Sequence, residues 1–305
     1  GDAAVTPRCS NTDTHRSVRR HWLAAIGISA ALCSATVQAA IPDPERQALI
    51  DLYQLTRGFQ WTHSDGWNGA PGTECAWYGV TCNAAGTHVV QISVAGNRLA
   101  GTLPASLQRL ARLVNLDASL DSLTGEIPPL AGFAYLRRFD VGGYGSNPLT
   151  GTIPLLPSSL EVFVASYNSL SGEIPPLAGL PQLGYFEVSG NPLSGSIPPL
   201  DGLWNLLEFA APDNQLTGQI PPLAGLARLG DFDVNTNRLP GSIPVPGERL
   251  AYFDISHNEL AGAIPPLAGH WALTEFFADH NQLSGRIPPL RGLHSSTSST
   301  SATTC

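Results

Sequence analysis

The sequence predicts an α/β solenoid in which turns of about 23 residues stack behind a helical N-terminal segment. Three observations lead to this fold class. A Gly-x-Ile/Leu-Pro unit occurs nine times, at spacings of 21 to 26 residues. A Leu stands two residues before the Gly of each unit, and an Asn, or once an Asp, stands four residues before it. Just upstream, apolar residues alternate as in a short strand with one buried face.

Each repeat contributes one short strand and one sharp turn. The polar turn residues are Asn97, Asp121, Asn147, Asn168, Asn191, Asn214, Asn237, Asn258 and Asn281. The repeat glycines are Gly101, Gly125, Gly151, Gly172, Gly195, Gly218, Gly241, Gly262 and Gly285. One turn cannot bury its apolar side alone, so stacking supplies a continuous core. The recurring Ile-Pro-Pro-Leu segments predict a mostly non-helical side opposite the strands, because each Pro removes a donor and restricts the residue before it.

The full pattern, Leu-x-x-Phe-x-Val-x-x-Asn-x-Leu-x-Gly-x-Ile-Pro, resembles the plant-type leucine-rich repeat found in receptor ectodomains and in polygalacturonase-inhibiting proteins. The resemblance covers residues 91–290, with nine repeat units. It implies a right-handed, curved superhelix with parallel strands on its concave face. It also implies a ladder of inward Asn side chains that satisfy backbone groups of adjacent turns. Asp121 lacks the amide donor of this ladder, so its turn is the one least certain to be regular.

Residues 40–90 differ in kind and predict an N-terminal cap. Ala48, Leu49, Leu52 and Leu55 have the spacing of an amphipathic helix. The later segment Cys75-Ala-Trp-Tyr-Gly-Val-Thr-Cys82 resembles the cap of plant-type and related bacterial leucine-rich repeat proteins. In an exported chain this resemblance implies a disulfide between Cys75 and Cys82. A metal site at the two cysteines is the alternative, and it lacks a second Cys or His pair with zinc spacing.

The two ends of the chain predict export and an uncapped last repeat. Arg16, Arg19 and Arg20 precede an apolar run, so residues 1–39 are interpreted as an upstream segment and signal peptide, with an N-terminal membrane anchor as the alternative. We therefore expect a secreted or periplasmic protein without a stable membrane anchor in the mature chain. Residues 291–305 form a Ser/Thr-rich tail that cannot build a core. Truncation of the chain and a dimer through the uncapped end both account for the missing cap.

The strand residues that point away from the core predict a binding surface. Adjacent strands lie about 4.8 Å apart, so these residues form columns across the concave face. In the later repeats the columns combine carboxylates with aromatic side chains, although only 13% of the chain is charged. The candidate partner-binding residues are Tyr185, Glu187, Glu208, Asp213, Asp231, Asp233, Tyr252, Asp254, His257, Glu275, Phe277, Asp279 and His280. A merely solvated face is the alternative, and the exposed aromatics argue for a partner.

Composition and motifs disfavour nucleic-acid binding and catalysis. The chain has no Lys, and its 16 Arg face 24 acidic residues, for a net charge of −8. We find no nucleophile motif and no phosphate-binding loop, so we predict no enzyme, no catalytic residues and no cofactor. Asp254, Asp279, His257 and His280 carry side chains of the types that bind cations. Stacked columns produce such clusters automatically, however, and we predict no metal site.

These features predict noncatalytic recognition of a protein or peptide by the concave face of a secreted protein. Electrostatic complementarity predicts a basic patch on the partner. The resemblance adds an alternative function, the inhibition of a secreted enzyme such as a polygalacturonase. The Arg-only N-terminal segment and the bacterial-style cap favour a bacterial source, and the resemblance suggests contact with a host.

Overall fold

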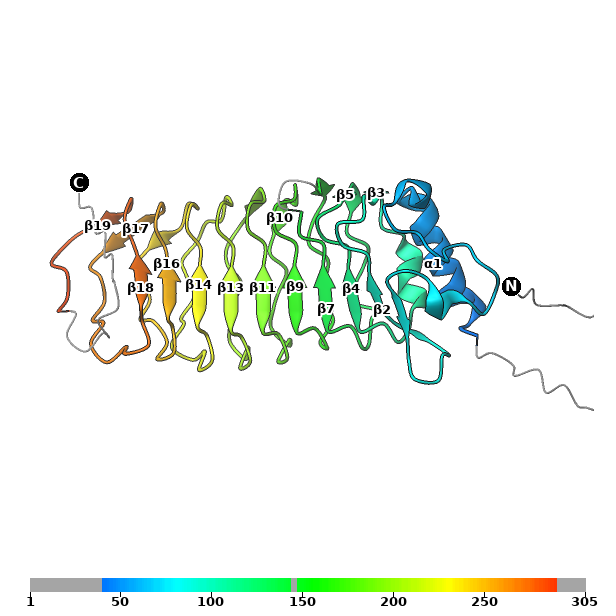
Figure 1. Ribbon diagram of the computed structural model, residues 1–305. Helices are drawn as coiled ribbons and strands as arrows, with labels where there is room; N and C mark the ends of the chain where they lie inside the picture. Colours follow the sequence, from blue (N-terminus) through cyan, green and yellow to red (C-terminus); the bar gives the residue numbers. More distant parts are fainter. Residues whose placement is uncertain (1–39, 144–146, 290–305) are drawn as a thin grey trace, which may run out of the picture. The chain divides into compact units, whose positions relative to one another are not determined.

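The computed structural model describes residues 40–143 and 147–289, which belong to one compact unit. Within it, the chain forms a β-solenoid with a helix near its start and a disulfide in the cap, as predicted. The strands of successive turns lie side by side in one sheet (Figure 1). The predicted signal peptide and the Ser/Thr tail lie outside the described residues, so both remain predictions.

The main sheet contains ten strands in the order β1-β2-β4-β7-β9-β11-β13-β14-β16-β18. Their bounds are β1 Val80–Cys82, β2 Val89–Ser93, β4 Asn115–Asp117, β7 Arg138–Asp140, β9 Val162–Val164, β11 Tyr185–Glu187, β13 Glu208–Ala210, β14 Asp231–Asp233, β16 Tyr252–Asp254 and β18 Glu275–Phe277. Only the β1–β2 pair is antiparallel. The other strands pair in parallel one turn apart, so that Phe186 lies between Phe163 and Phe209.

Short strands also join the Leu-x-Gly segments of neighbouring turns, which the sequence analysis did not predict. They are β3 Ala100–Gly101, β5 Ser122–Leu123, β6 Gly125–Glu126, β8 Leu149–Thr150, β10 Gly172–Glu173, β12 Leu193–Ser194, β15 Pro240–Gly241, β17 Glu259–Gly262 and β19 Gln282–Leu283. They pair in parallel as β3–β5, β6–β8, β10–β12 and β15–β17–β19. Adjacent turns are therefore held together at a second edge, in addition to the main sheet.

The side opposite the main sheet is mostly non-helical in the described residues, as predicted. The exception is the 3₁₀ helix η3 (Ala105–Arg109) in the first repeat. There, Pro104 is followed by Ala105, whereas later repeats carry a second Pro at the corresponding place. Because a Pro just before a helix costs no hydrogen bond, this segment can form a helical turn.

The core follows the sheet as a row of buried aromatic side chains. Phe139, Phe163, Phe186, Phe209 and Phe232 are each at most 1% exposed. Neighbouring rings in this row stack with centroids 5.4 to 6.0 Å apart. Leucines and isoleucines of the turns complete the core on the other side of each ring. The row fixes the spacing of the turns, and with it the spacing of the outward residues.

The Asn ladder forms at the end of each strand. Asn191 is a typical member: its Oδ1 accepts the N–H of Leu170 at 2.9 Å, in the preceding turn. Its Nδ2 donates to the carbonyls of Ala165 and Val188, both at 3.0 Å. One amide side chain thus satisfies buried backbone groups of two turns, which explains why an Asn recurs at each sharp bend.

The cap covers the start of the stack. Helix α1 (Asp43–Leu55) contains the predicted amphipathic segment. Asp43 and Glu45 lie in its first turn, where the helix dipole favours acids. The 3₁₀ helices η1 (Gly58–Gln60) and η2 (Glu74–Ala76) follow. Cys75 and Cys82 form the disulfide implied by the family resemblance, with Cα atoms 5.4 Å apart.

The tryptophans of the cap form its core. The rings of Trp61 and Trp67 meet edge to face at 4.9 Å, and Trp67 contacts Trp77 at 5.2 Å. Two buried acids are each paired: Glu45 with the Nδ1 of His88 at 2.6 Å, and Glu74 with Arg46. These pairs connect segments far apart in sequence and could not be predicted from local patterns.

Candidate partner-binding face

The candidate site lies on the outer surface of strands β11 to β18, and we call it the strand face. It comprises the thirteen residues predicted above. In the sheet register, Tyr185, Glu208, Asp231, Tyr252 and Glu275 occupy one column, one residue per turn. The residues two positions later, from Glu187 to Phe277, form the next column. The β-strand alternation thus places all of these side chains on the side opposite the Phe row.

Five carboxylates of these columns form what we call the acidic strip: Glu187, Glu208, Asp231, Asp233 and Glu275. They come from β11, β13, β14 and β18, four of five consecutive strands. Glu208 pairs in register with Asp231. Glu275 is exposed, and the other four are half-buried. These four half-buried carboxylates are not fully hydrated, yet they remain accessible to a partner.

The acidic strip holds carboxylates that resist ionisation. Partial burial, and next the charge of Asp233, raises the pKa of Asp231 to about 6. Burial also raises the pKa of Asp233 to about 6, although hydrogen bonds from Asn235 oppose this shift. The pKa values of Glu187 and Glu208 are raised as well, first by burial and then by neighbouring carboxylates. Near neutral pH the strip therefore carries negative charge that a bound cation would stabilise.

Asp254 differs from the other predicted site residues because it is only 8% exposed. Its Oδ1 accepts from the backbone N–H and the hydroxyl of Ser256, at 2.9 and 2.6 Å. Its Oδ2 accepts from the hydroxyl of Tyr252 and from Nδ2 of Asn235, both at 3.3 Å. Asp254 thus orients neighbouring side chains of the strand face and is itself largely covered.

Aromatic side chains flank the acidic strip. Tyr185 is exposed at one end of it. At the other end the ring of Tyr252 lies 5.8 Å from that of Phe277. Burial, followed by the charges of Asp233 and Asp254, raises the pKa of the Tyr252 hydroxyl, so this group remains a neutral hydrogen-bond donor. Aromatic residues beside carboxylates can pack against the stem of an Arg or Lys side chain.

A further column lies where each strand ends, directly before the ladder Asn. Its residues Asp213, Thr236, His257 and His280 have left-handed backbone conformations, with φ between 52° and 54°. Thr236 is a β-branched residue in this conformation, which is uncommon. The rings of His257 and His280 stack with centroids 4.1 Å apart. His280 Nδ1 also lies 2.7 Å from Oδ2 of Asp279.

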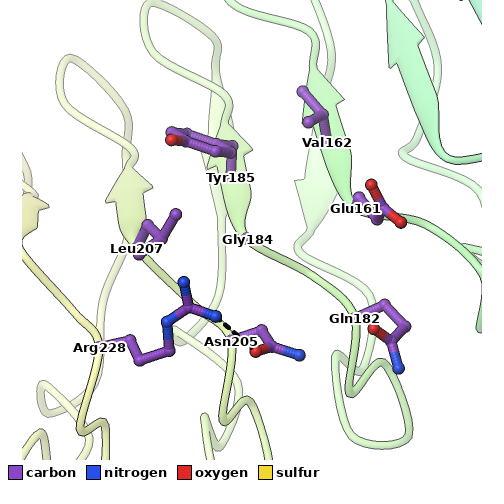
Figure 2. Close-up of a pocket in the computed structure, with 8 residues that line it drawn as sticks. All are labelled: Glu161, Val162, Gln182, Gly184, Tyr185, Asn205, Leu207 and Arg228. Atoms are coloured by element: carbon purple, nitrogen blue, oxygen red, sulfur yellow. Dashed lines mark hydrogen bonds between the residues drawn. The ribbon is translucent and has the colours of Figure 1, made fainter.

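A shallow pocket of about 290 Å³ adjoins the strand face where β9, β11 and β13 begin. Figure 2 shows its lining side chains, which are Glu161, Val162, Gln182, Gly184, Tyr185, Asn205, Leu207 and Arg228. Arg228 donates through Nη1 to Oδ1 of Asn205 at 2.8 Å. Of the predicted site residues, only Tyr185 lines this pocket. The pocket therefore adds one acidic and one basic side chain, Glu161 and Arg228, next to the strand face.

Two contributors to the face were missed by the sequence analysis. Asn235 donates through Nδ2 to Asp233 at 2.8 Å as well as to Asp254, so it bridges two turns. Continuing the alternation by two residues beyond Asp233 would have identified it. Arg138 lies one turn before Val162 in the first column and pairs with Asp140 at 2.7 Å. Extending the columns back to β7 would have revealed this cation near the start of the face.

Within the described residues, we find no helix long and apolar enough to cross a membrane. No family model matches the chain. Among curated proteins, STRUBBELIG-RECEPTOR FAMILY 2 of Arabidopsis thaliana is 38% identical over 89 residues, covering 28% of this chain and 12% of that protein. Two Arabidopsis leucine-rich repeat receptor-like kinases match similarly. The chain spans only about a tenth of the length of these relatives.

Solved structures similar to the chain also include the ectodomain of a plant receptor. The plant peptide hormone receptor RGFR1, solved in complex with RGF2, superposes with a TM-score of 0.59 at 31% identity, covering 65% of this chain and 33% of the receptor. A plant ice-binding protein shares the fold, with a TM-score of 0.59 at 23% identity over 82% of this chain and 90% of that one. Together with the nine repeats, the Asn ladder and the cap disulfide, these similarities show that the chain has a leucine-rich repeat fold similar to that of plant receptor ectodomains.

Proposed function

We propose that this protein binds a basic peptide or protein segment on its strand face, without catalysis and outside the cell. The observation that carries the proposal is the acidic strip. Its carboxylates come from four of five consecutive turns. The pKa values of Asp231 and Asp233 are raised to about 6. A cationic side chain placed over them would offset the repulsion that raises these pKa values.

The strand face also offers contacts that give specificity. Tyr185 at one end and the Tyr252–Phe277 pair at the other are large, rigid side chains of the type enriched at protein interfaces. The pocket beside Tyr185 adds room for one further side chain. An extended peptide lying across the strands would meet the pocket, the acidic strip and the aromatic pair in that order.

Export is part of this proposal. It is supported by the Arg-bearing, apolar N-terminal segment of the sequence and by the Cys75–Cys82 disulfide, which is the kind of bond that persists in oxidising compartments. Recognition of a peptide is the reported property of one structural relative, the peptide hormone receptor RGFR1 in complex with RGF2. That similarity supports a peptide as the partner and does not indicate the sequence of the peptide.

A display library of peptides, half of them Arg- or Lys-rich, tests the proposal. We expect basic peptides with one aromatic residue to be selected and to lose at least tenfold in affinity on the variant Glu208→Gln/Asp231→Asn/Asp233→Asn. The matched control is Glu126→Gln/Glu173→Gln/Glu259→Gln. It removes the same number of charges from exposed residues of the short strands β6, β10 and β17, and it should retain binding. Equal loss in both variants, or selection of acidic peptides, would refute the proposal.

The inhibitor alternative predicts a different outcome for the partner. If the captured partner is a secreted hydrolase, such as a polygalacturonase, its rate should fall stoichiometrically with added protein. The same Glu208→Gln/Asp231→Asn/Asp233→Asn variant should then relieve the inhibition. Binding without a change in rate assigns recognition alone.

A further inference from the structure

The candidate for a second function is the histidine pair at the far end of the strand face. His257 and His280 occupy equivalent positions one turn apart, directly before the ladder residues Asn258 and Asn281. Both have left-handed backbone conformations, with φ of 53° and 52°. The N–H of His257 donates to the carbonyl of Asp279 at 3.0 Å, and the N–H of Asn258 donates to that of His280 at 3.1 Å. The backbone thus holds the two imidazoles in register.

The ladder makes this arrangement rigid. Asn281 donates through Nδ2 to the carbonyls of Ala278 and Asp279, both at 3.2 Å. Asn258 donates in the same way to Ser256 at 3.0 Å, one turn earlier. The backbone that carries His257, Asp279 and His280 is therefore fixed by buried and part-buried hydrogen bonds, while both imidazole rings remain exposed to solvent. An ion could reach them without any opening of the fold.

The three side chains present a compact set of donor atoms. One ligand atom from each of His257, Asp279 and His280 lies within 4.8 Å of the others. His280 Nδ1 and Asp279 Oδ2 are already 2.7 Å apart. In a tetrahedral zinc site, two ligand atoms that each lie about 2.1 Å from the metal are separated by about 3.4 Å. The exposed rings, which now stack at 4.1 Å, would have to turn so that their nitrogens converge on the ion.

We propose that His257, His280 and Asp279 form a binding site for a divalent transition-metal ion such as Zn²⁺. Two imidazoles and one carboxylate suit zinc and its neighbours in the periodic table better than Ca²⁺ or Mg²⁺, which prefer all-oxygen ligands. Three protein ligands leave at least one coordination position for water or another donor. This inference departs from our sequence-based prediction of no metal site. It uses three residues of the strand face, but it is argued from observations other than those that support the proposed partner recognition.

Calorimetric titration of the metal-free full-length protein with ZnCl₂ alone tests the site. The variants are His257→Asn, His280→Asn and the double variant, because Asn tolerates the left-handed conformation. Thr236→Asn is the matched control, at the same position one turn before His257. We expect one zinc ion to bind with micromolar affinity, each single variant to bind at least tenfold more weakly, and the control to bind as the parent does.

A second readout separates coordination from weak surface binding. Cobalt(II) bound to two imidazoles and a carboxylate gives visible absorption bands, and these should disappear in His257→Asn/His280→Asn and weaken in Asp279→Asn. Circular dichroism checks that the variants stay folded. Zinc binding that is unchanged in the double variant would assign it to other histidines and overturn the proposal. So would an absence of binding at 100 μM zinc, about a hundred times a micromolar dissociation constant.

Discussion

Asp121 accepts the backbone N–H of Asn97 at 2.8 Å through Oδ1, so an acid occupies one position of the Asn ladder. The same oxygen accepts the N–H of Leu99 at 2.9 Å, which is the acceptor role that Asn191 plays for Leu170. The donor role is missing: Oδ2 of Asp121 is buried without a hydrogen-bond partner. Burial raises the pKa of Asp121 to about 6, against the bonds from Leu99 and Asn97, which lower it.

The variant Asp121→Asn should stabilise the protein by about 2 kcal/mol at pH 7.5, because it removes a buried charge and restores a donor. The folded-state pKa lies above the ordinary value of 3.8, so the cost of ionised Asp121 grows between about pH 4 and pH 6 and stays constant above that range. The gain should therefore shrink as the pH falls from 7.5 to 4.5. Urea unfolding of both proteins at the two pH values measures this. A gain that grows toward low pH would contradict the assignment.

The turn around Asp121 was the one that the sequence marked as least certain, and its backbone is nonetheless regular. The acceptor half of the ladder needs only a carboxyl or amide oxygen, and Asp supplies it. Sequence reasoning located the departure correctly because the ladder is strictly periodic. Sequence reasoning overestimated the effect of Asp121 on the backbone of its turn. The missing donor lowers the stability of the fold but does not displace the chain.

The paired variant Asp231→Asn/Asp233→Asn should also raise stability at pH 7.5, by about 1 to 2 kcal/mol. The raised pKa values of both groups mean that their ionised forms are disfavoured in the folded protein, and solvent screening of half-exposed charges reduces the effect below the full shift. The gain should vanish below about pH 4, where both states are protonated. The control Glu126→Gln/Glu173→Gln should change the unfolding free energy by less than 0.5 kcal/mol, as expected for surface positions.

Ionisation of Asp231 and Asp233, which lowers stability, should strengthen the binding of a basic peptide. Above about pH 6, Asp231 and Asp233 are ionised and attract a cation, and below it they become protonated. We expect the dissociation constant to rise at least tenfold between pH 7.5 and pH 5, and the curve to flatten in Asp231→Asn/Asp233→Asn. Fluorescence anisotropy with a Lys- or Arg-based peptide selected from the library measures it. Tighter binding at pH 5 would exclude the acidic strip as the contact surface.

Thr236 should be a point of backbone strain. Its φ of 54° is unfavourable for a β-branched residue, whereas Asn accepts this region readily. The variant Thr236→Asn should therefore stabilise the protein by about 0.5 to 1 kcal/mol, even though it loses the bond from Thr236 Oγ1 to Asn235. Denaturant unfolding measures this change, with Thr274→Asn as a control at an exposed Thr that does not have a positive φ.

The strands, the ladder and the outward columns were predictable because each depends on a fixed period. The sheet register places Tyr185 opposite Glu208 and Asp231 opposite Tyr252, as the columns require. Depth was not predictable: alternation tells which face a side chain occupies and says nothing of how deeply neighbours cover it. Asp254 is buried for this reason, since Ser256, Tyr252 and Asn235 all bond to it.

The second row of short strands was missed because Gly and Pro dominate its segments, and these residues argue against strands when read locally. The pairing there depends on stacking. Once the main sheet and the Phe row set the distance between turns, the Leu-x-Gly segments lie within hydrogen-bonding reach of each other. Thr124 then donates its N–H to Gly101 at 2.7 Å, and Ser171 donates to Gly151 at 2.8 Å.

Each repeat contains positions that the fold requires, such as the ladder Asn, and outward positions that can be substituted. Asn191 bonds only to backbone atoms, in its own turn and in the one before, so it is indifferent to the side chains at Tyr185 and Glu187. Whole turns can accordingly be duplicated or lost without a change of bonding pattern, and outward residues can be exchanged at little cost to folding. Substitutions at the outward positions can therefore alter the binding surface while the backbone hydrogen bonds of the ladder stay the same.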